Sequence, residues 1–121
     1  MKLASGDMLT FGLDTRGCVL QCIGHDDVPR VEKEGRGWRD GDRVILQGTD
    51  VALLLYRLTT GGGMVVAETP RTSMLCVNTS CDERGEITYV FKTDSNEIRL
   101  KAYERDMFMT ALESQVWRFF Q

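Results

Sequence analysis

The sequence predicts a mainly β domain, an antiparallel barrel or sandwich of about seven strands capped by one C-terminal helix. Two observations lead to this prediction. Short apolar runs alternate with glycine-rich or charged breaks over residues 8–102, and residues 104–120 then change to a helical period without glycine or proline. Because 121 residues is the usual length of one domain, we expect residues 1–121 to form a single unit.

The first half of the chain is predicted to hold strands at 8–13, 18–23, 44–47 and 51–58. The turn signal at 14–17 joins the first two strands into a hairpin, and 48–50 reads as a turn between the last two. Residues 51–56 are apolar on both faces, which is typical of a central or covered strand. Three consecutive glycines, 61–63, end this region.

The second half is predicted to hold strands at 64–67, 74–78, 87–92 and 97–102. The last two flank Asp94, Ser95 and Asn96 and form the clearest hairpin in the sequence. Apolar residues recur there with period 2, as in antiparallel strands that have one face in water.

The predicted helix over 104–120 carries an apolar stripe at about 100° per residue. Its members are Phe108, Ala111, Leu112, Val116 and Phe119. No good N-cap residue precedes the segment, so its start is defined only to within a residue or two. We expect the stripe to pack on the strands.

The final strands and helix resemble those of pleckstrin-homology-like (PH-like) domains. In that family, two closing strands run into a helix with a large aromatic residue, usually tryptophan, three residues before an Ala-Leu pair. Phe108 stands at that position here, before Ala111 and Leu112, and the resemblance covers about the last 40 residues. It implies a non-catalytic binding or scaffolding module, one domain of a larger cytosolic or cytoskeleton-associated protein. A polo-box-like domain, which would imply dimerisation or phosphopeptide binding, is an alternative resemblance, as is a GRAM-type or GLUE-type domain.

Composition excludes several functional classes. A net charge of −3 argues against nucleic-acid binding, and no apolar run approaches the roughly 20 residues of a membrane span. The first residues contain no signal peptide, so we expect a cytoplasmic protein with reduced cysteines. The spacings of Cys18, Cys22, Cys76 and Cys81 lack the tight C-x2-C of a zinc knuckle, and we expect neither metal nor cofactor.

Catalytic signals are weak. His25 lies beside Asp26 and Asp27, but no serine or cysteine nucleophile stands in a recognisable elbow, and a solvated loop explains the histidine better. The glycine run 61–63 lacks the lysine and Ser/Thr of a phosphate-binding loop. We therefore expect no enzymatic activity.

Two candidate binding sites remain. In many PH domains, basic residues in the first inter-strand loop bind inositol phosphates, which would here be Arg30, Lys33, Arg36, Arg39 and Arg43. Residues 26–43 hold one more acidic than basic residue, so phosphoinositide membranes are the less favoured partner and a solvated loop is the commoner explanation.

The second candidate is an apolar flank of the helix formed by Met109, Trp117 and Phe120. Trp117 lies about 180° from Phe108 around the helix and so leaves the core-facing stripe. Aromatic and methionine side chains are enriched at protein interfaces, so another protein, a peptide or a second copy of the chain is the expected partner. Alternatively, the flank is covered by an N-terminal strand or curls onto the barrel.

Overall fold

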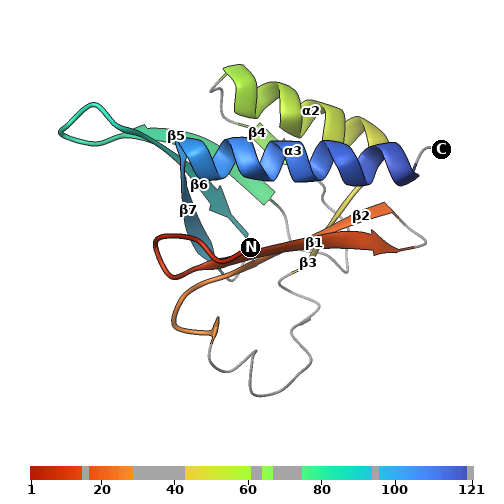
Figure 1. Ribbon diagram of the computed structural model, residues 1–121, viewed down its shortest axis with the longest axis horizontal. Helices are drawn as coiled ribbons and strands as arrows, with labels where there is room; N and C mark the ends of the chain where they lie inside the picture. The colour runs from red at the N-terminus through yellow and green to blue at the C-terminus, as the bar shows by residue number, and fades with distance from the viewer. Residues whose placement is uncertain (15–16, 29–42, 61–63, 67–74, 94–95, 120–121) are drawn as a thin grey trace.

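The computed structural model describes residues 1–14, 17–28, 43–60, 64–66, 75–93 and 96–119. One antiparallel sheet has the order β1-β2-β3, with strands Met8–Asp14, Gly17–Ile23 and Arg43–Leu46. A second antiparallel sheet has the order β4-β5-β6-β7, with strands Met64–Val66, Leu75–Cys81, Ile87–Lys92 and Glu97–Lys101. Helix α2 spans Gly48–Thr60 and helix α3 spans Ala102–Phe119. The two helices lie side by side (Figure 1).

The mainly β character and the C-terminal helix are confirmed. β1 and β2 pair as the first predicted hairpin, and β6 and β7 pair as the hairpin predicted over 87–102. Ala102, predicted as the end of a strand, instead begins α3. The predicted barrel is wrong for the described part of the chain, where the two sheets stay separate and do not close into one.

The predicted strand at 51–58 is also wrong, because this segment is the middle of α2. Val51, Leu54 and Leu58 are its buried residues, and their spacing of three and four matches one side of a helix. A short, wholly apolar run does not distinguish a helix from a strand by its period. The chain therefore leaves β3 into a helix rather than into a fourth strand.

Both helices begin with the same hydrogen-bond arrangement, in which a carboxylate three residues on accepts the backbone N–H of the residue before the helix. Asp50 Oδ2 accepts from Gln47 N at 2.9 Å, and Glu104 Oε1 accepts from Lys101 N at 3.0 Å. The carboxylates also lie where the helix dipole favours negative charge. Gln47 and Lys101 therefore occupy the N-cap positions of the two helices, where the sequence carries none of the usual N-cap residues Ser, Thr, Asp or Asn.

One cluster of buried side chains joins both sheets and both helices. Strand β2, the middle strand of the first sheet, is buried along its whole length. Cys18, Leu20 and Cys22 point into the cluster, while Val19 and Ile23, on the opposite face of the strand, are also buried. A strand covered on both faces explains the unbroken apolar run around the cysteines.

Phe108 of α3 connects the two sheets. Its side chain is fully buried and makes edge-to-face contacts with Phe11 of β1 at 5.6 Å and with Phe91 of β6 at 5.5 Å between ring centroids. Such aromatic pairs contribute about 0.5–1.5 kcal/mol each beyond the burial of area. One side chain of α3 thus contacts both sheets.

Replacing this ring tests its role. We expect Phe108→Ala to lower the free energy of unfolding by about 3–5 kcal/mol, because a large cavity opens between the sheets. Phe11→Ala, at the partly buried end of the same stack, is the matched control and should cost less. Urea unfolding followed by circular dichroism measures both. A loss below about 1 kcal/mol for Phe108→Ala would show that the sheets are held together without this ring.

The two helix caps differ in burial, which gives a second prediction. Glu104 is 3% exposed and also accepts from Ala4 N at 2.8 Å, whereas the Asp50 contact lies at the surface. We expect Glu104→Ala to cost about 2–4 kcal/mol, since two charge-assisted hydrogen bonds are lost. Asp50→Ala should cost about 1 kcal/mol, the usual effect of one exposed cap. Equal losses in urea unfolding would contradict this difference.

Candidate functional site

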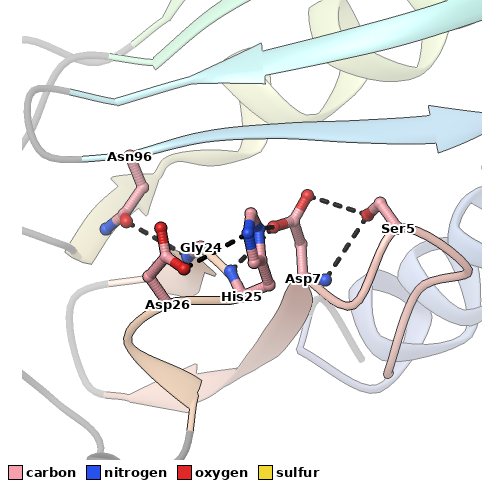
Figure 2. Close-up of polar contacts among 6 residues, drawn as sticks. All are labelled: Ser5, Asp7, Gly24, His25, Asp26 and Asn96. Carbon is pink, nitrogen blue, oxygen red and sulfur yellow. Dashed lines mark hydrogen bonds and ion pairs between the residues drawn. The ribbon is translucent and has the colours of Figure 1, made fainter.

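His25 lies in a polar cluster between the N-terminal segment and the end of β2 (Figure 2). Its Nδ1 is 3.3 Å from Oδ1 of Asp7, and its Nε2 is 3.3 Å from Oδ1 of Asp26. Asp7 also accepts the backbone N–H of His25 at 2.8 Å and the hydroxyl of Ser5 at 2.8 Å. The imidazole, 64% exposed, therefore lies between a buried and an exposed carboxylate.

Serine, histidine and aspartate are thus in contact, but not in the order that nucleophilic catalysis requires. In a catalytic triad the histidine accepts the serine proton while the carboxylate orients the imidazole from its other nitrogen. Here Ser5 donates to Asp7 and not to His25, and Nε2 faces the carboxylate of Asp26. The relay of a catalytic triad is therefore not formed among these three residues.

The cluster instead fastens the N-terminal segment. Met1 and Leu9 exchange backbone hydrogen bonds of 2.8 and 2.9 Å, and Ala4 is held by Glu104 of α3. Asp7, 5% exposed, binds this segment to the residue after Gly24. Gly24 N in turn donates to the Asn96 side chain at 3.1 Å, which connects the first sheet to the turn before β7 (Figure 2).

The predicted phosphate ligands cannot be assembled into a site. Arg30, Lys33, Arg36 and Arg39 lie outside the described residues. Arg43 begins β3, opposite Gln21 of β2, and its side chain is not among those described. Phosphoinositide binding therefore stays a prediction from the sequence.

The predicted interaction flank of α3 is only partly described. Met109 is half-buried and packs against the core. Trp117 lies in the last turn of the helix with its side chain outside the described part, and Phe120 lies beyond it. The large apolar side chains that α3 exposes among the described residues are Tyr103 and Met107, each 57% exposed.

Sequence reasoning missed Tyr103 and Met107 because it expected the helix to begin at residue 104 and followed the flank that contains Trp117. The two residues are four apart and lie on the side of α3 away from Leu112. With the stripe centred between Phe108 and Leu112, a helical wheel places Tyr103 about 160° and Met107 about 120° from the centre of the stripe. That position was the signal available in the sequence.

The four cysteines differ in burial. Cys18 and Cys22 are buried, Cys76 is half-buried and Cys81 is exposed, and all four are free thiols. Among the described residues, no group of three or more His, Cys, Asp or Glu side chains is arranged to hold a metal ion. Burial raises the pKa of the Cys18 thiol to about 11, because the thiolate would lose its hydration.

No protein-family model, curated protein or solved structure matches the chain significantly. In the described part of the chain, no helix combines the length and the apolar character needed to cross a bilayer.

The Cys18 thiol makes stability depend on pH. Its pKa rises from an ordinary value of 9.0 to about 11 on folding, so the unfolded chain ionises first as the pH increases. We expect its contribution to be complete below pH 9 and to disappear as the pH approaches 11. In urea unfolding, the stability of the wild type relative to Cys18→Ala should fall over this range by up to roughly 3 kcal/mol. Parallel pH profiles would contradict this expectation.

Proposed function

We propose that the protein is a non-catalytic binding module that acts through contact with another protein, using the outer side of α3. The observation that carries this proposal is the pair Tyr103 and Met107, two large apolar side chains left in water on the helix side opposite the core. Aromatic residues and methionine are enriched at protein interfaces, where they supply most of the binding energy.

The surface next to this pair is suited to receive a side chain. A shallow depression of about 470 Å³ is lined by Asp106, Met107, Thr110, Ala111 and Ser114. Its floor is made of small residues one helical turn apart, which form a groove into which the ridge of a partner helix packs. Position 117 falls fourteen residues after Tyr103, about four helical turns, and so on the same side of α3. The predicted role of Trp117 is consistent with this surface.

The resemblance to PH-like domains supports the same class of function. Two strands run directly into the C-terminal helix, and Phe108 is buried at the position where that family carries its aromatic residue. Helix α2, between the third and fourth strands, has no counterpart in the outline expected from the resemblance. We accordingly propose a PH-like variant that acts as one domain of a larger cytoplasmic protein.

Affinity capture from a cell lysate with matched variants tests the surface. Met107→Glu places a charge on the outer side of α3, and we expect it to lower the amount of the specific partner that is captured at least fivefold. Tyr56→Glu changes a similarly exposed side chain on α2 and should leave capture unchanged. Light scattering of the same proteins reports whether the partner is a second copy. Equal capture by the wild type and Met107→Glu, with both folded, would refute the proposed surface.

A further inference from the structure

The second sheet extends beyond the helices that cover it. In Figure 1 the hairpin of β5 and β6 projects past the ends of α2 and α3. Along the core-facing side of β6, burial falls steadily: Phe91 is fully buried, Tyr89 is 5% exposed and Ile87 is 47% exposed. The helices therefore leave uncovered the end of a sheet face that is otherwise core.

A cavity of about 420 Å³ lies over this uncovered face. Its sheet side is formed by Ile87 and Tyr89 together with the residues paired to them across β5, Cys81 and Thr79. Ser80 of β5 also reaches it, and the last turn of α2 forms the opposite wall. This volume is within the range of about 300–1,000 Å³ that is usual for small-molecule pockets.

Arg105 of α3 holds the sheet and helix walls in place. Its guanidinium donates to the Tyr89 hydroxyl and, at 3.1 Å, to the carbonyl of Leu58 in α2. It also lies 4.7 Å from the centre of the Tyr89 ring, where the cation is attracted to the ring face. One partly buried side chain thus connects the end of α2 to the sheet, so the two walls of the cavity are held relative to each other.

The α2 wall offers hydrogen-bond acceptors. Thr59 Oγ1 donates to Leu55 O at 2.9 Å and Thr60 Oγ1 donates to Arg57 O at 3.5 Å, so each hydroxyl proton is engaged and its lone pairs remain. The carboxyl end of a helix is also the negative end of its dipole. This wall therefore favours a ligand that presents N–H or O–H donors.

The rest of the lining selects against charge. Among the described residues that line the cavity, none carries a carboxylate, ammonium, guanidinium or imidazole group. A charged ligand would find no counter-ion among these described lining residues. Ile87 and Tyr89 offer an apolar surface instead.

We propose that this cavity binds a small uncharged amphipathic molecule. Its amide or hydroxyl donors face Thr59 and Thr60 at the end of α2, and its apolar body lies on Ile87 and Tyr89. The site is separate from the outer side of α3, so it stands or falls independently of the proposed protein contact.

Cys81 makes the cavity accessible to experiment, because its exposed thiol lines the wall. In a Cys76→Ser background, the protein is equilibrated under mild reductant with disulfide compounds that share one linker. Their end groups are a neutral aryl or alkyl amide, a carboxylate or an ammonium. Intact mass spectrometry measures the conjugated fraction. We expect the neutral amides to conjugate at least threefold more than either charged group.

Two variants identify the origin of this preference. Thr79→Phe fills the cavity and should abolish it, whereas Lys92→Phe, an exposed position on the opposite face of β6 and away from the cavity, should leave it intact. Conjugation of a linker without an end group reports the intrinsic reactivity of the thiol in each protein. Equal conjugation of all end groups, a preference for a charged group, or a preference that survives in Thr79→Phe would overturn the proposal.

Discussion

The contact of Phe108 with Phe11 and Phe91 is the interaction on which the rest of the structure depends. No ladder of hydrogen bonds joins the two sheets in the described part of the chain, so their relative position is set by side-chain packing. The ring of α3 touches one aromatic residue in each sheet, edge to face. Because close-packed interiors tolerate little change of shape, this aromatic contact also helps to define where α3 lies over the sheets, and α2 packs beside α3.

Two buried carboxylates also join segments that are far apart in the sequence. Glu104 joins the start of α3 to Ala4, and Asp7 joins the same N-terminal segment to His25 after β2. Each carboxylate satisfies backbone donors that would otherwise be buried without a partner, at a cost of about 1–3 kcal/mol apiece. The N-terminal segment is therefore an integral part of the fold, and the histidine that suggests chemistry in the sequence has a structural role in the Asp7 cluster.

Both proposed surfaces lie where one layer of the fold is not covered by another. α3 must bury the side that carries Phe108, which leaves Tyr103 and Met107 in water on the other side. The hairpin of β5 and β6 projects past the ends of α2 and α3 (Figure 1), which leaves Ile87 and Cys81 exposed. These exposed apolar groups are the observations on which both proposals rest.

Local pattern by itself determined the hairpins and the C-terminal helix, because turn residues and apolar periods act over a few neighbouring residues. It failed over 51–58, where the apolar run 51–56 has no readable period, although Asp50 before the segment and the glycines after it in the sequence are signals of helix ends. It also favoured Met109 over Met107, since it could not tell which flank of α3 meets the core. The separation of the two sheets, the Ser5–Asp7–His25 order and the cavity beside α2 were decided only by tertiary structure. Each depends on side chains far apart in the sequence, whose meeting is set by packing and by the satisfaction of buried polar groups rather than by any local preference.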